Sequence, residues 1–215
     1  MRNRLKYKAV IFDMDGLIVD TEPLFYQAMA DVLKKREITI GIDDYVNNDL
    51  QKGKKLLKTY FNSRDIYAVQ REIYKNYEKL LKRKAKLMPG AKKTILRLQK
   101  HYALALVSSS RKKFIEYILN FSHLKNTFKT IISREDVKKQ KPNPDCFKIA
   151  VKKLGLSAHE CIALEDSERG IIAAIGSGMK CIAIPNKLTE NGNFMKATKI
   201  IKSITEVNIN LIENL

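Results

Sequence analysis

Four short polar clusters stand directly or closely behind apolar runs of this 215-residue chain. They are Asp13-Met14-Asp15-Gly16, Ser108-Ser109-Ser110, Lys141 in a Lys-Pro-Asn-Pro run, and Glu165-Asp166-Ser167. Short apolar runs with β-branched members predict buried strands. If the strands form an open parallel sheet, all four clusters meet in the crevice outside the carboxyl ends of the strands, where such sheets bind ligands.

The residue types in these clusters suit phosphoryl transfer. Asp13 and Asp15 are alternate residues at a strand end, so their carboxylates face one side. Carboxylates held together repel one another unless a cation joins them, and oxygen ligands without His or Cys favour Mg²⁺. Lys141, with hydroxyls and backbone N–H groups, suits the oxygens of a phosphate. A carboxylate nucleophile beside Mg²⁺ and a lysine is the composition that this chemistry requires.

Strand-like and helical patterns alternate along most of the chain. The strand-like runs are residues 8–12, 103–107, 130–132, 161–164, 181–184 and 200–201. Helical patterns lie between them, and one of these patterns stops at Gly155, a residue typical of helix ends. This alternation predicts an α/β fold with a parallel sheet that is covered by helices on both faces.

Residues 20–85 interrupt the alternation with helical patterns alone. Pro23 stands where a helix begins, and apolar residues then repeat at helical spacing in three stripes. We therefore expect two domains: a core made of residues 1–19 and 86–215, and an inserted helical cap domain of residues 20–85.

The run from Phe12 to Glu22, Phe-Asp-Met-Asp-Gly-Leu-Ile-Val-Asp-Thr-Glu, resembles the first motif of the haloacid dehalogenase-like (HAD) phosphohydrolase superfamily. Ser108, Lys141 and Glu165-Asp166 resemble its second, third and fourth motifs, in the same order. The match is to the helical-cap branch, which includes β-phosphoglucomutase-like enzymes and sugar-phosphate and pseudouridine-5′-phosphate phosphatases. The resemblance implies a Rossmann-like core with an inserted α-helical cap.

The resemblance also implies catalytic and metal-binding roles. Asp13 would be the nucleophile that forms an aspartyl-phosphate, and it would also bind Mg²⁺. Asp15 would act as general acid and base, while its backbone carbonyl binds the metal. Asp166 would be a further metal ligand, with Glu165 acting directly or through water.

Phosphate binding is implied for three more residues of the matched motifs. The Ser108 hydroxyl and the Ser109 amide would hold the phosphoryl group that is transferred. Lys141 would neutralise its charge and hold Asp13 close. Ser109 and Ser110 have a weaker claim to a functional role than Ser108, because serines also favour loops and helix caps.

Two enzymatic hypotheses share these core residues: a phosphatase transfers the phosphoryl group to water, and a phosphosugar mutase transfers it to a second sugar hydroxyl. Mutase-like relatives tend to carry a His where this chain has Phe25, and a Gly-Arg-Ser-like turn near Asn47-Asn48-Asp49-Leu50. Both departures favour a phosphatase acting on a small phosphate monoester. The substrate stays open; the cap residues expected to face it are Asn48, Gln51, Lys52 and Lys55.

The formal net charge of +18 raises a third, non-enzymatic hypothesis, a basic module that binds nucleic acid. Residues 20–86 carry 15 basic and 10 acidic side chains, and the other 148 residues carry 26 and 13. Because no segment forms a basic arm, we expect a lysine-rich surface that attracts anionic substrates and no nucleic-acid partner. Nucleic-acid binding would depend strongly on salt.

The remaining bulk features favour a cytoplasmic monomer. Cys146, Cys161 and Cys181 are widely spaced, which predicts buried free thiols and no disulfide or zinc site. No apolar run approaches the length of about 18 residues that a membrane span needs. The charges of Asp13 and Asp15 break the first apolar run, which argues against a secretion signal.

Overall fold

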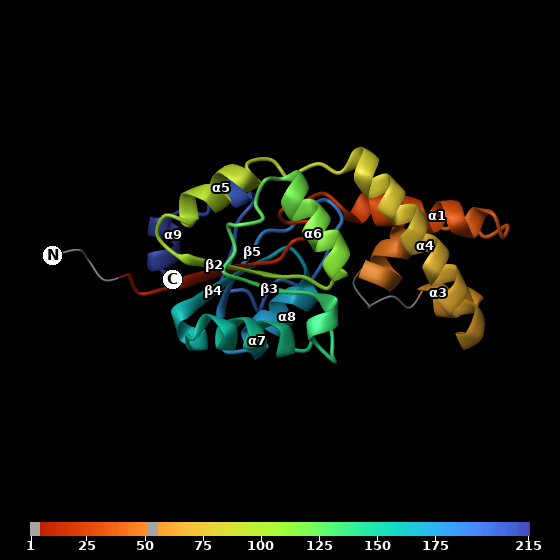
Figure 1. Cartoon of the computed structure of the whole chain (residues 1–215). Coiled ribbons are helices and arrows are strands. Elements are labelled where there is room, and N and C mark those ends of the chain that lie inside the picture. The colour runs from red at the N-terminus through yellow and green to blue at the C-terminus, as the bar shows by residue number, and fades with distance from the viewer. Residues whose placement is uncertain (1–4, 51–55) are drawn as a thin grey trace. The chain divides into compact units, whose positions relative to one another are not determined.

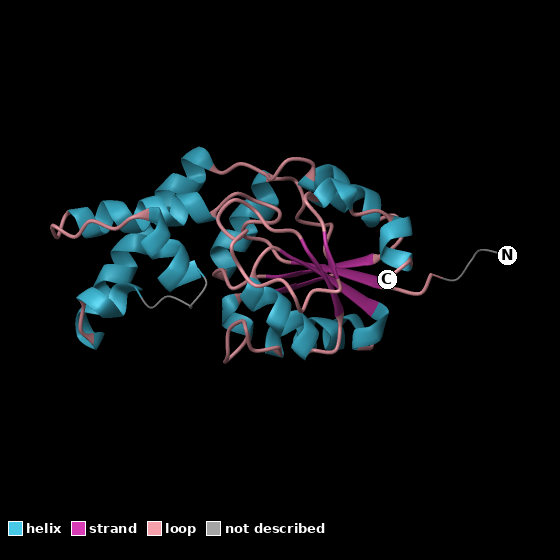
Figure 2. Ribbon diagram, turned by 180° about the vertical axis from the view of Figure 1, so that it is seen from behind, coloured by secondary structure: helices cyan, strands magenta, loops and turns pink. Residues whose placement is uncertain are grey.

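The computed structural model describes residues 5–50 and 56–215. The chain divides into two compact units, residues 1–19 together with 87–215, and residues 20–86. Strands are found only in the first unit, as Figure 2 shows for the described part of the chain.

Six parallel strands form one sheet in the order β3-β2-β1-β4-β5-β6. They are β1 (Ala9–Phe12), β2 (Ala103–Val107), β3 (Thr130–Ile132), β4 (Cys161–Glu165), β5 (Lys180–Ala183) and β6 (Lys199–Ile200). Each of the six coincides within about one residue with a strand-like run of the sequence. The α/β prediction with a parallel sheet is therefore confirmed.

Helices cover both faces of this sheet (Figure 1). In the order of the chain they are α5 (Ala91–Leu98), α6 (Lys112–Phe121), α7 (Asp145–Leu154), α8 (Glu168–Gly176) and α9 (Ile209–Glu213). Helices α7 and α8 lie on one face, and α5 and α6 lie on the other. Helix α7 ends at Gly155 with φ of 67°, a left-handed conformation that glycine adopts without steric cost.

The two faces of the central strands differ in side-chain size. Toward α7 and α8, the inner strands β1 and β4 present Ala9, Ile11, Cys161 and Ala163, all fully buried. The same cluster contains Phe147 of α7. Small side chains let a helix approach the sheet closely, and large residues from the helix then fill the space. The other face of β1 carries Val10 and Phe12.

The unit of residues 20–86 is built from helices and loops. Its helices are α1 (Glu22–Lys34), α2 (Ile42–Tyr45), a turn of π-helix (Val46–Leu50), α3 (Leu56–Tyr60) and α4 (Ser63–Lys84). Helix α4 buries Val69, Ile73, Tyr77 and Leu81, a spacing of four residues that gives one apolar stripe. Helices α1 and α4 pack against each other. No helix in the described part of the chain is long and apolar enough to cross a membrane.

The strand register brings the ends of three strands to one level. Phe12 pairs with Leu106 of β2 and with Leu164 of β4. The residues that follow these positions therefore emerge together at the carboxyl edge. They include Asp13 and Glu165, the last residue of β4.

Helix α8 contains two glycines whose surroundings differ. A Cβ atom at Gly170 would lie 1.9 Å from Oε2 of Glu165, whereas one at Gly176 would meet nothing closer than 3.6 Å. Gly170 therefore lets α8 pack directly on the Glu165 carboxylate. Only a residue without a side chain fits at this contact.

We predict that Gly170→Ala lowers the free energy of unfolding by about 1–3 kcal/mol, the usual cost of overpacking a core. Gly176→Ala, in the same helix, should be neutral or stabilising by up to about 1 kcal/mol, because Ala has the higher helix propensity. Urea denaturation of both variants in EDTA measures the difference. Equal losses of unfolding free energy in the two variants would contradict the packing of Glu165 against Gly170.

Candidate active site

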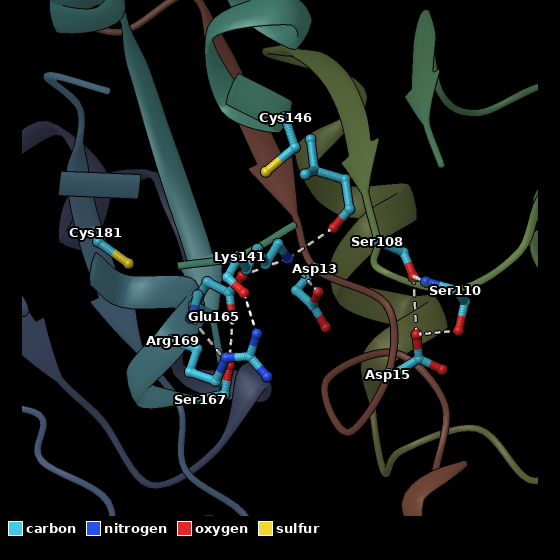
Figure 3. Close-up of polar contacts among 12 residues, drawn as sticks. Asp13, Asp15, Ser108, Ser110, Lys141, Cys146, Glu165, Ser167, Arg169 and Cys181 are labelled. Atoms are coloured by element: carbon cyan, nitrogen blue, oxygen red, sulfur yellow. Dashed lines mark hydrogen bonds and ion pairs between the residues drawn. The ribbon is translucent and has the colours of Figure 1, made fainter. Parts of the chain in front are cut away.

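A buried lysine joins two buried carboxylates at the carboxyl edge of the sheet (Figure 3). Lys141 lies in the loop before α7, and its Nζ donates to Oδ1 of Asp13 at 2.6 Å and to Oε1 of Glu165 at 2.7 Å. Its third hydrogen bond goes to the carbonyl oxygen of Val107 at 3.0 Å. The three N–H groups of the ammonium thus have three acceptors. Lys141 and Asp13 are each 6% exposed and Glu165 is fully buried.

The charges of these groups are strongly coupled. Burial raises the pKa of Asp13 well above its usual range, and the charges of Glu165 and Asp15 raise it further against the opposing effect of Lys141. Burial alone would lower the pKa of Lys141. The carboxylates of Asp13 and Glu165 outweigh burial and hold that pKa well above its ordinary value. Lys141 therefore keeps its positive charge in the folded protein.

Several neighbours hold the Lys141–Glu165 pair in place. The Ser167 hydroxyl donates to Oε2 of Glu165 at 3.3 Å, and Ser167 also caps helix α8 by accepting from the Gly170 amide. Arg169, in the first turn of α8, donates a hydrogen bond to the backbone carbonyl of Lys141. Burial lowers the pKa of Arg169.

Asp166 completes a cluster that has the composition of a metal site. Asp13, Glu165 and Asp166 are all buried, and each offers an oxygen within 4.8 Å of the others. Lys141 forms ion pairs with two of the three carboxylates, Asp13 and Glu165, and supplies one positive charge. Buried like charges require compensation, so the donor set suits a hard divalent cation such as Mg²⁺.

Asp15 lies beside this cluster and is held by hydroxyl groups. The hydroxyls of Ser108 and Ser110 both donate to Oδ2 of Asp15, each at 2.8 Å (Figure 3). Ser108 follows β2, and its amide donates to the Ile132 carbonyl at 3.0 Å, which continues the ladder toward β3. Ser108 Oγ also accepts from the Ser110 amide at 2.9 Å. Ser109 lies between them and is half-buried.

The structure thus brings the motif residues together at one edge of the sheet, and it adds three residues that the motifs did not include. Ser110 contacts Asp15 as directly as Ser108 does. Asn186 donates to Asp166, and it follows β5, so the rule of polar residues behind strand ends could have found it. Arg169 had no such signal, because its partner is a backbone carbonyl.

The expected substrate-side residues of the inserted unit are only partly described. The Asn48 side chain donates to the Asp44 carbonyl at 3.0 Å. Gln51, Lys52 and Lys55 lie outside the described residues. Phe25 belongs to an aromatic cluster, with ring centroids 5.3 Å from Tyr77 and 5.7 Å from Tyr74.

The three cysteines agree with the sequence prediction. Cys146, Cys161 and Cys181 are free and buried. Burial raises the pKa of the Cys161 thiol to about 11 and that of Cys181 well above its ordinary value. Their thiols therefore stay protonated and pack as small apolar groups.

The fold and the site together define a hydrolase class. Residues 10–184 match the family model of the haloacid dehalogenase-like hydrolases. Since this range covers most of the chain, the protein belongs to the haloacid dehalogenase-like hydrolase family. The family resemblance drawn from the four motifs is confirmed.

Two relatives match this chain over nearly their whole length. YhcW of Bacillus subtilis (strain 168) is 32% identical over 220 residues, which cover 95% of this chain and 96% of that protein. Hexitol phosphatase B of Escherichia coli (strain K12) is 28% identical over 211 residues, which cover 93% of each. Family membership and a full-length relative named as a phosphatase support the predicted enzyme class, a HAD-type phosphatase.

Solved structures share the fold. A HAD hydrolase of family IA, variant 3, from Entamoeba histolytica superposes with a TM-score of 0.85 at 26% identity, covering 96% of this chain and 98% of that one. A mutant of CbbY from Rhodobacter sphaeroides in complex with xylulose-(1,5)bisphosphate gives a TM-score of 0.83 at 23% identity, covering 95% and 97%.

We predict that Lys141→Met lowers the free energy of unfolding by about 3–5 kcal/mol in EDTA, because it leaves two buried carboxylates without their cation. The matched control is Lys153→Met: Lys153 and Asp136 form a surface pair at 3.9 Å, and its loss should cost at most about 1 kcal/mol. Urea denaturation tests both variants. Similar losses would show that the Lys141 pairs contribute no more than a surface pair.

Proposed function

We propose that this chain is a Mg²⁺-dependent phosphatase that hydrolyses small phosphate monoesters through an aspartyl-phosphate on Asp13. The observation that carries the proposal is the Asp13 carboxylate, held by Lys141 inside a cluster of three buried carboxylates. A carboxylate that is oriented by an ammonium group and lies beside a cation site is equipped to attack phosphorus.

The proposed metal ligands are Asp13, Asp166 and the backbone carbonyl of Asp15, with Glu165 acting directly or through water. The three buried carboxylates support this set because each offers an oxygen within 4.8 Å of the others, a spacing that one cation can bridge. When bound, Mg²⁺ would neutralise charge on the phosphoryl oxygens. Glu165 already accepts from Lys141, so we assign it the second task of holding that ammonium in place.

In the first half-reaction, a carboxylate oxygen of Asp13 attacks the phosphorus of the monoester. The bond from phosphorus to the leaving oxygen breaks, and Asp15, in its protonated form, gives its proton to the departing alcohol. Asp13 then carries an acyl phosphate. The hydrogen bond from Lys141 to Oδ1 fixes the rotation of the Asp13 carboxylate before the attack.

In the second half-reaction, water attacks the phosphorus of the aspartyl-phosphate and gives a proton to the Asp15 carboxylate. The bond between phosphorus and the Asp13 oxygen breaks, which releases inorganic phosphate and restores both side chains. The hydroxyls of Ser108 and Ser110 support this role because both donate to Oδ2 of Asp15 and so orient its carboxyl group.

The phosphoryl group would be bound by the Ser108 hydroxyl, the Ser109 amide and the Lys141 ammonium, with Ser108 and Lys141 each turning one donor from its present acceptor to a phosphoryl oxygen. Ser108 supports this assignment by its position beside Asp15, directly behind β2. The net charge of +18 would draw anionic substrates toward the protein.

We further propose that the substrate is a sugar or polyol phosphate. Among the relatives is a hexitol phosphatase, and the related fold of CbbY was solved with xylulose-(1,5)bisphosphate. We assign substrate selection to residues 20–86, in the role of a cap. The carboxylates and the lysine of the core would act on the phosphoryl group, which every phosphate monoester has in common, and so would not distinguish one substrate from another.

The first test is phosphate release from phosphosugars, polyol phosphates, nucleotides and p-nitrophenyl phosphate, each with Mg²⁺ and with EDTA. We expect release that requires Mg²⁺ and is fastest with a sugar or polyol phosphate. Isomerisation of a phosphosugar without release of phosphate would identify a mutase instead. Release that is equally fast in EDTA would refute the metal assignment.

The second test is Asp13→Asn, which removes the nucleophile and one negative charge at nearly constant volume. Turnover should fall by about a thousandfold or more, because the covalent path is lost. The thermal midpoint should show that the variant is folded. Asp65→Asn, at an exposed position of α4, is the matched control and should keep full turnover. Turnover of Asp13→Asn within tenfold of the wild type would refute the nucleophile assignment.

A further inference from the structure

Asn186 connects two of the loops that carry proposed metal ligands. It lies three residues behind β5, and its Nδ2 donates to Oδ2 of Asp166 at 2.8 Å and to the backbone carbonyl of Gly16 at 3.1 Å. Gly16 directly follows Asp15. One side-chain amide thus bonds to the carboxylate behind β4 and to the backbone of the loop behind β1.

The orientation of this amide is determined by its other hydrogen bonds. Oδ1 of Asn186 accepts from the backbone amide of Leu188 at 2.8 Å and from that of Thr189 at 3.3 Å. The buried Thr189 hydroxyl in turn accepts from the backbone N–H of Asn186 at 2.9 Å. Because backbone N–H groups can only donate, the oxygen of the Asn186 side chain must face them. Its NH₂ group therefore faces Asp166.

The contact leaves no room for a larger residue in the first loop. Gly16 has φ of 80°, and a Cβ atom there would lie 2.3 Å from Oδ2 of Asp166 and 2.6 Å from Nδ2 of Asn186. Gly16 thus allows the Asp166–Asn186 pair to pack directly on the backbone behind Asp15. The Asp166–Asn186 pair and Gly16 therefore form one closely packed contact at the carboxyl edge of the sheet.

We propose that Asn186 is a positioning residue that orients the Asp166 carboxylate for the divalent cation. This inference rests on the metal site of the proposed function. A hydrogen bond to Oδ2 fixes the rotation of the Asp166 carboxylate, so less side-chain conformational entropy is lost when a cation binds. The donor is a neutral amide that brings no positive charge to the site; a lysine at this place would compete with the metal. Such outer partners of metal ligands commonly change metal affinity by 10–100-fold.

The experiment titrates wild type and variants with Mn²⁺ as the only divalent cation. The electron paramagnetic resonance signal of the free ion measures how much Mn²⁺ stays unbound at each step. Asn186→Leu removes every side-chain hydrogen bond at similar volume. Asn186→Ser is the gentler variant: its hydroxyl is able to accept from the same backbone amides and keep the turn, but it is too short to replace the amide at Asp166. Asn208→Leu and Asn208→Ser are the matched controls, because Asn208 caps α9 through the Leu211 amide.

We expect both Asn186 variants to bind Mn²⁺ about 10–100-fold more weakly than wild type, and both Asn208 variants to bind within about twofold. Asp166→Ala gives the benchmark for loss of the ligand itself. Thermal midpoints in EDTA identify the variants that are folded. If Asn186→Leu does not fold, the Mn²⁺ affinity of Asn186→Ser tests the positioning role. Affinity of Asn186→Ser within about threefold of wild type would overturn the positioning role.

The two proposals fail in different ways. If wild type and Asp166→Ala bind Mn²⁺ equally poorly, the metal site of the proposed function is wrong, and the role of Asn186 is wrong with it. If wild type binds Mn²⁺, Asp166→Ala does not, and the Asn186 variants match wild type, only the positioning role is overturned.

Discussion

The ammonium group of Lys141 lies buried between the carboxylates of Asp13 and Glu165, and the arrangement of the site depends on this contact. A buried charge without a partner is costly, so each of the three groups constrains the others. Lys141 reaches the cluster from the loop before α7, while its partners follow β1 and end β4. The same contact that balances the charges therefore holds three separate segments of the chain at one point.

Close approach of the backbone is the second constraint on this edge of the sheet. Gly170 lets α8 pack against the Glu165 carboxylate, and Gly16 leaves space for Asp166 and Asn186. At both positions a Cβ atom would fall within the contact distance of a carboxylate oxygen. Glycine is needed here because polar groups and backbone share a space that is too small for a side chain.

The site combines two kinds of hydrogen-bond donor. A charged donor, Lys141, binds the carboxylates of Asp13 and Glu165 and cancels part of their charge. Neutral donors contribute to holding two others: Ser108 and Ser110 donate to Asp15, and Asn186 donates to Asp166. Neutral donors orient a carboxylate and leave its charge in place. This division suits a centre in which some carboxylates are expected to bind a cation and another to exchange protons.

The sequence by itself determined the strands, the inserted helical segment and the motif residues, because short apolar runs, helical spacing and polar clusters behind strands are local patterns. Family membership followed from the same motifs. Only the tertiary structure decided which groups meet: Lys141 bonds to Asp13 across 128 positions of the chain, and Asn186 to Gly16 across 170. These contacts depend on strand order, register and helix packing, which no local pattern encodes. For that reason the role of Arg169, and the contacts of Ser110 with Asp15 and of Asn186 with Asp166, emerged only from the folded chain.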